Sequence, residues 1–207
     1  MTTDWSTTAA IFACSHRKGG NSRRAAELLA EGVAQAGGRA QIIDLREFSV
    51  LHCLACGGCA RDGQSRCVLR AKDQAEELFA PLLAAPVVAL ASPVYFYALP
   101  SRLKALIDRS QRFWEARRKG DAWLCGLPPR RGFACFVAGQ PSGDKLFEGP
   151  RLTLKYFLNN FGIALEDPLT LRGLDGPGDL GADSGASARA LELGQVMGRT
   201  LGAQFRG

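Results

Sequence analysis

The stretch VVALASPVYFYALPSRLKALIDR, residues 87–109, decides the fold of this chain. Residues 87–92 form a continuous apolar run of strand length, which is typical of a central parallel strand covered on both faces. Pro93 ends that run, and apolar residues then recur at helical spacing from Leu103 to Phe113. A buried strand followed directly by an amphipathic helix indicates an α/β domain with a parallel sheet.

Strands and helices alternate in the same way on both sides of this stretch. Further strands are predicted at 9–14, 40–45, 130–139 and 165–171, with helices between them, a loop at 175–187 and a final helix at 188–205. This order predicts a doubly wound sheet, which binds ligands beyond the carboxyl ends of its strands. With no internal repeat and no dividing linker, we expect a single domain over 1–207, carrying a cysteine-rich loop insertion at about 48–70.

The composition limits the possible partners. Hydrophobic residues make up 46% and charged residues 22%, which is ordinary for a globular protein and argues against a disordered chain. The formal net charge is +6, but there is no long basic run, so we expect no nucleic-acid partner. The longest apolar stretch, residues 81–91, is too short to span a bilayer, and no signal peptide is recognised. We therefore expect a cytoplasmic protein without membrane contact.

The loop after the first strand has the composition of an anion site. It reads SHRKGGNS, residues 15–22, and combines hydroxyls, two cations and flexible backbone at the start of a helix. Free backbone N–H groups and the helix dipole favour an anion there. Ser15, Asn21 and Ser22 are candidate donors to phosphate oxygens, and Arg17 is a candidate for paired hydrogen bonds to them. A capped helix beside a solvated basic turn would leave the same pattern.

Two further loops follow strands at the same predicted edge. After the third strand, Pro93 leads into Tyr95, Phe96 and Tyr97, an environment that suits a flat heteroaromatic ring. Plain core packing of these aromatic side chains is the alternative. After the fourth strand, residues 138–143 hold glycines and a glutamine, which suit either close approach of a ligand or a structural turn.

Together these loops resemble the NADPH-dependent FMN reductase family. The block SPVYFYALPSRLKALIDR, residues 92–109, is similar to the family's S-P-V-Y-[FW]-x3-[ST]-x2-[LM]-K-x-[FL]-[IL]-D-R. The loop at 15–22 is similar to S-x-R-x2-[GS]-[NS]-[ST], with His16 where many members carry proline. The resemblance covers nearly the whole chain. It implies a flavodoxin-like, five-stranded parallel sheet of order 2-1-3-4-5 with helices on both faces.

The resemblance also implies FMN as cofactor and NAD(P)H as electron donor. No catalytic side chain is assigned, because N5 of the flavin carries the chemistry. Lys104 and Asp108 are expected to form an ion pair within a helix. The implied FMN contacts are Ser15, Arg17, Asn21 and Ser22 with the amides of Lys18, Gly19 and Gly20 at the phosphate, and Pro93, Val94, Tyr95 and Phe96 with Gly139 and Gln140 at the ring.

Cys53, Cys56, Cys59 and Cys67 resemble the compact motif of the iron–sulfur flavoproteins, a branch of this family. A [4Fe–4S] cluster needs four thiolates, one for each iron. Zinc and free thiols remain open alternatives, although zinc prefers two separated pairs of ligands. The other cysteines, at positions 14, 125 and 135, are expected to be small buried hydrophobes.

The expected function is an FMN-dependent NAD(P)H oxidoreductase that passes electrons between FMN and a [4Fe–4S] cluster. The alternatives are an FMN or quinone-type reductase without a cluster, and a pure electron carrier between ferredoxin-like partners. The family resemblance implies a homodimer or homotetramer, with NAD(P)H or a ferredoxin-like protein as donor. A candidate basic surface for a nucleotide phosphate or an acidic redox partner comprises Arg109, Arg112, Arg117 and Arg118.

Overall fold

Strand β3 (Val87–Pro93) lies at the centre of a parallel sheet, and all of its residues are buried. The computed structural model describes residues 3–204 and pairs β3 with β1 (Ala9–Ala13) and β4 (Arg130–Val137). Outside β1 lies β2 (Ala40–Asp44), and β5 lies outside β4. The order β2-β1-β3-β4-β5, with every pair parallel, confirms the doubly wound sheet predicted from the sequence.

The fifth position of the sheet is shared by two short strands. The sequence predicted one strand at 165–171, but β5 (Ile163–Leu165) pairs with the start of β4 and β6 (Leu169–Leu171) pairs with its end. Pro168 lies between them and has no N–H to donate to the ladder. The single predicted strand is therefore interrupted at its proline.

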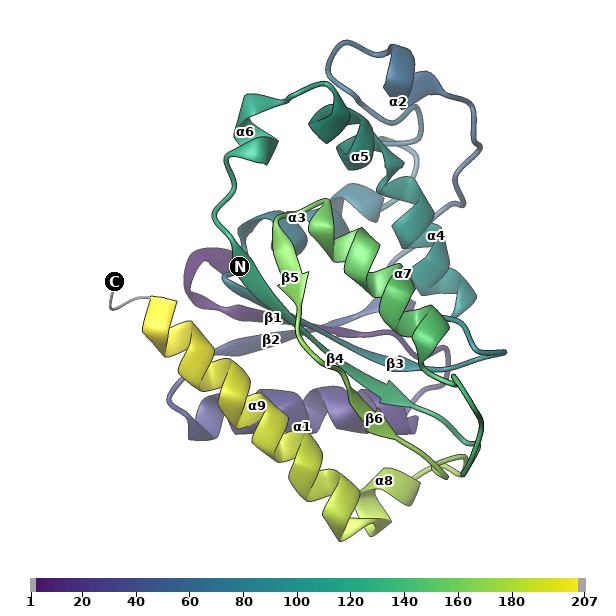
Figure 1. The fold of residues 1–207 in the computed structure, drawn as a ribbon, viewed down its shortest axis with the longest axis vertical. Helices are drawn as coiled ribbons and strands as arrows, with labels where there is room; N and C mark the ends of the chain where they lie inside the picture. Colours follow the sequence, from purple (N-terminus) through teal and green to yellow (C-terminus); the bar gives the residue numbers. More distant parts are fainter. Residues whose placement is uncertain (1–2, 205–207) are drawn as a thin grey trace.

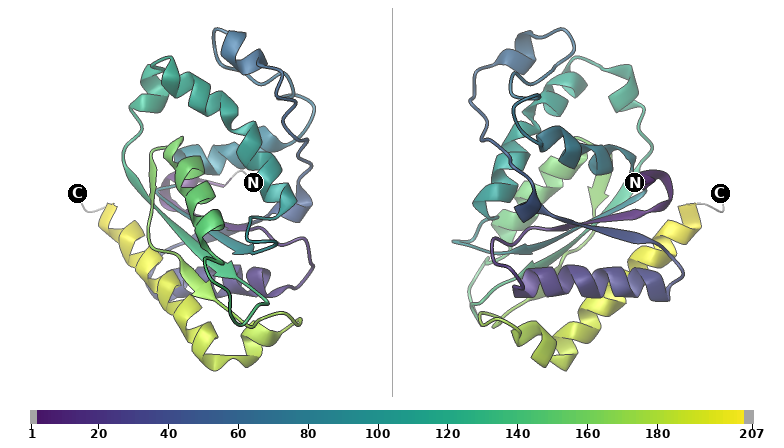
Figure 2. Two further views of the ribbon diagram at one scale, coloured as in Figure 1. Left: turned by 45° about the vertical axis from the view of Figure 1, so that its right-hand side comes forward. Right: turned by 180° about the vertical axis from the view of Figure 1, so that it is seen from behind.

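Helices cover both faces of the sheet (Figures 1 and 2). On one face lie α1 (Asn21–Gln35) and α9 (Ser184–Gln204), and on the other lie α3 (Ala75–Ala84), α4 (Ser101–Arg109) and α7 (Glu148–Asn159). None of the helices described over residues 3–204 has the length and apolar character needed to cross a membrane. The shorter elements are η1 (Trp5–Thr7), η2 (Leu45–Glu47), α2 (Gly58–Arg61), α5 (Gln111–Arg118), α6 (Ala122–Cys125) and α8 (Asp179–Ala182).

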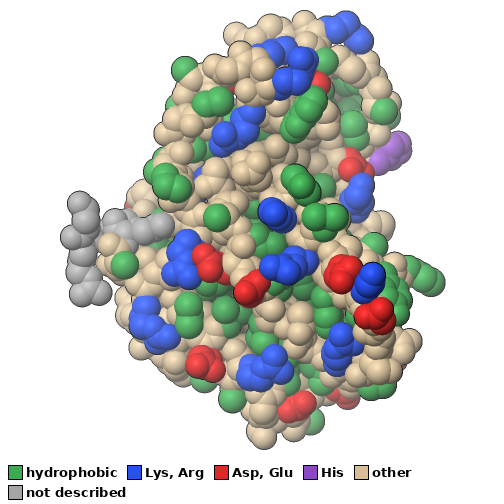
Figure 3. Space-filling view, in the orientation of Figure 1, with side chains coloured by type: hydrophobic (Ala, Val, Ile, Leu, Met, Phe, Trp, Pro, Cys, Tyr) green, Lys and Arg blue, Asp and Glu red, His purple; other side chains and the backbone are tan. Residues whose placement is uncertain are grey.

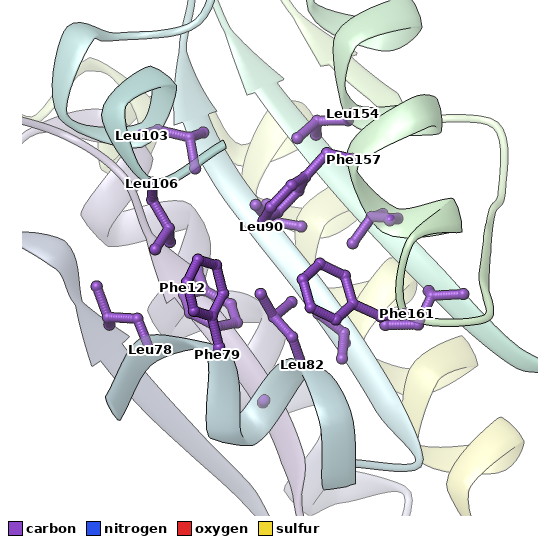
Figure 4. Close-up of a cluster of buried hydrophobic side chains, with 14 of the residues drawn as sticks. Phe12, Leu78, Phe79, Leu82, Leu90, Leu103, Leu106, Leu154, Phe157 and Phe161 are labelled. Atoms are coloured by element: carbon purple, nitrogen blue, oxygen red, sulfur yellow. The ribbon is translucent and has the colours of Figure 1, made fainter. Parts of the chain in front are cut away.

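The face covered by α3, α4 and α7 is closed by aromatic packing (Figure 4). The ring of Phe113 lies 4.9 Å from that of Phe79 and 4.8 Å from that of Phe161, measured between centroids. Both contacts are in the range favoured by edge-to-face and tilted pairs. Phe113 is thus a core residue, whereas its neighbour Trp114 is exposed.

The N-cap of α1 is Gly20, and Asn21 and Ser22 lie inside the first turn. One local expectation, the loop at 175–187, differs from the structure. The 175–187 stretch is not simply a loop, because it contains α8 and the first residues of α9. Its Gly and Asp residues serve as helix-end residues, as with Gly178 in the left-handed region before α8.

Helices α1 and α9 cross at glycines. A Cβ atom on Gly32 would lie 2.2 Å from the carbonyl oxygen of Leu191, and one on Gly194 would lie 2.3 Å from that of Leu29. Each neighbour is backbone, which cannot rotate away as a side chain can. Only glycine permits this close approach of the two helices.

We predict that Gly194→Ala lowers the free energy of unfolding by about 1–3 kcal/mol, because the added methyl group forces α9 away from α1. Gly181→Ala is the matched control, since a Cβ at Gly181 meets no atom within 4 Å. Chemical denaturation of both variants measures the difference. Equal stabilities for the two variants would refute the close-crossing explanation.

Candidate functional site

A cavity of about 580 Å³ opens at the carboxyl ends of β1, β3 and β4. All of the FMN-contact residues expected from the sequence line it, except Gly19. They come from three loops that are distant in sequence, which the parallel strand order brings to one edge. The lining residues that the sequence did not single out as FMN contacts are Tyr97, Val137, Ala138, Leu146, Leu174, Asp175, Gly176 and Pro177.

One end of this cavity is the start of helix α1. Within residues 3–204, the backbone N–H groups of residues 18–22 donate to no protein acceptor, while the carbonyl oxygen of Gly20 accepts from Arg23 and Arg24. The hydroxyl of Ser15 accepts from the N–H of Arg17 at 3.0 Å, which folds the loop back on itself. Free N–H groups at a helix start, beside the cations of Arg17 and Lys18, form an electropositive end suited to an anion.

The side chain of Asn21, a candidate phosphate donor by its position, is bonded within the protein. Its side-chain nitrogen donates to the carbonyls of Leu174 (3.0 Å) and Gly176 (2.9 Å), and its oxygen accepts from the N–H of Leu180 (3.1 Å). The side chain therefore ties the segment after β6 to the start of α1. Only the backbone N–H of Asn21 is left for an anion.

The opposite side of the cavity is a tight turn at the end of β3. Tyr95 and Ala98 exchange backbone hydrogen bonds at 3.0 and 2.9 Å, with Phe96 and Tyr97 at the two central positions. Both central residues have positive φ, 50° and 59°, which costs of the order of 1 kcal/mol each for a residue with a side chain. The ring of Phe96 is fully exposed at this edge. The turn therefore holds an uncovered aromatic ring beside the cavity.

The remaining wall joins the loop after β4 to the loop after β6. A Cβ on Gly139 would lie 2.8 Å from Oδ1 of Asp175, so glycine allows these loops to touch. Arg17 also reaches this wall, donating from Nη1 to the carbonyl of Asp175 at 3.2 Å. Residues 174–177 could have been predicted to line the cavity, because they follow the last strand and lie at the same edge of the sheet as the other loops.

A second cavity, of about 960 Å³, lies between α4, α5, α7 and residues 53–72, which we call the cysteine segment. Cys53, Cys56, Cys59 and Cys67 all line it, and all four are free thiols. Two of the sulfurs accept backbone hydrogen bonds: that of Cys53 from Ala55 N–H at 3.4 Å, and that of Cys67 from Leu69 N–H at 3.5 Å. Burial raises the pKa of Cys59 above its usual value.

The four cysteines line one cavity but form no compact metal site. Over residues 3–204, no three His, Cys, Asp or Glu side chains are grouped closely enough to hold a single metal ion. The segment itself is tightly coiled, with Ala55, Gly57 and Ser65 in the left-handed region. As a donor set, four free thiols around one cavity, with amide donors at two of them, fit a group bound through separate sulfurs.

Lys119 fastens the cysteine segment to the rest of the chain, donating to the carbonyls of Asp62 at 2.8 Å and Cys59 at 3.4 Å. Within the segment, Arg61 donates to the carbonyl of Cys56 at 2.8 Å. The four arginines expected to form a basic surface are all engaged within the chain, Arg109 with Asp73, Arg112 with Glu76, Arg117 with the carbonyl of Asn160 and Arg118 with Glu115. The expected ion pair of Lys104 and Asp108 is present at 2.7 Å.

The two cavities are separate. They share no lining residue, and the cysteine segment with α2 projects at one end of the molecule while α8 lies at the other (Figure 1). Of the cysteines outside the segment, Cys14 and Cys135 are buried as expected, but Cys125 is exposed on α6. The described part of the chain therefore holds two distinct cavities with different linings.

Comparison with known proteins identifies the family of the chain. The model of the NADPH-dependent FMN reductase family matches residues 7–124, more than half of the chain. An iron-sulfur flavoprotein of Methanosarcina thermophila is 34% identical over 131 residues, which cover 63% of this chain and 63% of that protein. The matched region thus spans less than two thirds of that relative.

Solved structures share the fold at low sequence identity. A flavone reductase matches with a TM-score of 0.69 at 13% identity, covering 96% of this chain and 64% of the other. A flavodoxin from the domain Archaea matches with a TM-score of 0.53 at 14% identity, covering 94% and 98%. The family-model match of the present chain, together with its strand order, shows that this flavodoxin-like chain belongs to the NADPH-dependent FMN reductase family.

Proposed function

We propose that this chain is an FMN-dependent NAD(P)H oxidoreductase whose flavin site is the cavity at the carboxyl edge of the sheet. The observation that carries the proposal is the polarity of that cavity. One end offers the unpartnered N–H groups of residues 18–22 and the other offers a platform of backbone and aromatic side chains. FMN is complementary to this cavity, because it carries an anionic phosphate at one end and a flat ring at the other.

The residues divide between the two ends of FMN. At the phosphate we place Ser15, Arg17 and Ser22, together with the N–H groups of residues 18–22. At the ring we place residues 93–96, Gly139 and Gln140. Bound FMN supplies hydride acceptance at N5, and the protein binds and orients it and shapes the ring's surroundings.

We predict that Arg17→Glu weakens FMN binding by about 10–100-fold, because a charge-assisted hydrogen bond to the phosphate is replaced by repulsion. Riboflavin, which lacks the phosphate, should bind this variant as well as it binds the wild type. Arg24→Glu makes the same charge change on α1 at a residue outside the cavity lining, and it should leave FMN affinity unchanged.

Fluorescence titration with both flavins measures these affinities. An equal loss for riboflavin and FMN in Arg17→Glu would contradict the phosphate assignment. Loss of FMN affinity in Arg24→Glu would point to the general field of the molecule as the cause.

The cysteine segment is proposed to hold a [4Fe–4S] cluster through Cys53, Cys56, Cys59 and Cys67. Support comes from the four cysteine thiols that line one cavity, since a cubane needs one thiolate for each of its four irons. The relative from Methanosarcina thermophila is itself called an iron-sulfur flavoprotein. A cluster bound there supplies one-electron transfer.

We predict that Cys56→Ser loses bound iron and acid-labile sulfide while retaining FMN, because one of four ligands is removed from a site that shares no residue with the flavin cavity. Cys125→Ser is the control, since that exposed cysteine lies outside both cavities. Anaerobic purification with iron, sulfide, zinc and flavin measured per chain gives the result. Wild-type protein that carries zinc without sulfide would refute the cluster.

The electron partner of the cluster is proposed to be a small acidic, ferredoxin-like protein. Within the cysteine segment, Arg61, Arg66, Arg70 and Lys72 stand against a single acid, Asp62. Lys and Arg side chains gather at the end of the molecule that carries α2 (Figure 3). Such an uneven charge distribution steers an acidic partner toward that end.

Because the two cavities of one chain share no residue, we also propose a homodimer or homotetramer in which a flavin approaches the cysteine segment of a neighbouring copy. The exposed rings of Trp114 and Trp123 are candidates for such an interface.

For the acidic partner we predict that the double variant Arg70→Glu, Lys72→Glu slows reduction by a reduced ferredoxin about tenfold or more at low salt and flattens the salt dependence of the rate. Both residues are exposed and make no ion pair within residues 3–204. Arg199→Glu on α9 is the control, because it changes the net charge on the opposite face. Stopped-flow kinetics at several ionic strengths distinguish the two, and identical slowing by the control would contradict docking at the cysteine segment.

A further inference from the structure

Both stems of the cysteine segment meet at one buried arginine of α4. The N–H of Leu51, before the first cysteine, donates to Asp73 Oδ2 at 2.7 Å, after the last one. Arg109 contacts both sides of this junction, donating from Nη1 to the carbonyl of Leu51 at 3.2 Å and to Oδ2 of Asp73, and from Nη2 to Oδ1 of Asp73 at 3.3 Å. The guanidinium therefore closes the base of the segment.

The ion pair of Arg109 and Asp73 lies where burial imposes a desolvation cost on charged groups. The side chains of Arg109 and Asp73 are 1% and 0% exposed, and a buried pair is weak evidence for added stability because of its desolvation cost. Burial disfavours the charged form of Asp73, yet hydrogen bonds from Arg109, Leu51 and Ala75 hold its pKa below the usual value. The pair is thus kept charged in the interior, which calls for a role beyond packing.

The guanidinium also faces the site of the cysteines. Arg109 lines the same cavity as Cys67, and its buried Nε has no hydrogen-bond partner in the described part of the chain. The guanidinium therefore holds the stems and also lies at the wall of the cavity that the four cysteines line.

We propose that Arg109 is a positioning residue for the iron–sulfur centre, which fixes both stems of the cysteine segment and raises the reduction potential of the cluster through its charge at the wall of the cysteine cavity. This inference rests on the cluster proposed above. Reduction adds one electron to the cluster, and a fixed cation whose side chain is itself shielded from solvent favours the more negative, reduced form.

Asp73 acts with the opposite sign. Its carboxylate offsets part of the arginine's charge, so removing it leaves the cation less compensated. Lysine cannot replace the whole function, because bridging two carboxylate oxygens and a carbonyl needs the planar fork of arginine. Charge and fork can therefore be separated by substitution.

The test is an anaerobic redox titration of the reconstituted holoprotein, with dithionite as reductant and the cluster signal as readout. Arg109→Gln should lower the midpoint potential by the equivalent of about tenfold or more in the equilibrium constant, which is 59 mV for a one-electron couple. Asp73→Asn should raise the potential, and the double variant should return close to the wild-type value. Opposite shifts from the two partners are a signature that loss of structure alone does not produce.

Two further variants keep the inference falsifiable. Arg109→Lys retains the charge without the planar fork. The equilibrium constant for reduction of its cluster should therefore stay within about threefold of the wild-type value, whereas its iron should be lost to a chelator faster than in the wild type. Arg112→Gln removes an arginine that lines the same cavity but touches neither stem, and its shift should be well below that of Arg109→Gln.

The outcomes separate the two proposals. Wild-type protein that binds FMN but takes up no iron and sulfide overturns the cluster and this inference together. Wild-type protein with a cluster, and potentials that are unchanged in Arg109→Gln or equally shifted in Arg112→Gln, overturns the inference alone. If Arg109→Gln does not fold, Arg109→Lys decides the question. A fall of its midpoint potential equivalent to about tenfold in the equilibrium constant overturns the inference, because the charge is still present in that variant.

Discussion

The buried strand β3 is the constraint on which the rest of the molecule depends. It is hydrogen-bonded to β1 and β4 on its two sides, and all of its residues are buried. A strand in that position needs apolar cover on both faces, and each face has its own hydrophobic cluster beneath its own helices. Because its neighbours run parallel to it, three loops must leave the sheet at one edge, and the cavity between them follows from that geometry.

The two cavities of the chain are built on different physical bases. The one at the carboxyl edge is formed by the fold itself, since any sheet of this order brings the same loops together. The other lies between α4, α5, α7 and a segment that is held by individual polar contacts from Lys119 and, at its base, from Arg109. Rigid backbone positions the first site, whereas charged side chains position the second.

The sequence predicted those features that are encoded locally. The apolar run of β3, the loop at 15–22 and the spacing of the cysteines are visible without a structure, and the strand order followed from the family resemblance. What it missed depends on contacts between distant residues. The side chain of Asn21 looked like a phosphate donor, but it binds carbonyls of residues 174 and 176.

Arg109 is a similar case of a residue whose partner lies far away in the sequence. It belongs to a run of arginines that read as a basic surface, yet its partner Asp73 is 36 residues away and both are buried. Asp73 in turn accepts from the N–H of Ala75 at the start of α3, and it also joins two segments. Local pattern carries no information about such pairings, because hydrogen-bonding capacity alone does not identify the partner.

The cysteine segment takes almost no part in either hydrophobic cluster, since neither includes a residue between Cys53 and Val68. Its ends at Leu51 and Asp73 are already joined to each other by a hydrogen bond. A lineage could therefore shorten, lengthen or discard this appendage while the sheet and its helices kept folding. Insertions and deletions here would change the second cavity without exposing either hydrophobic cluster.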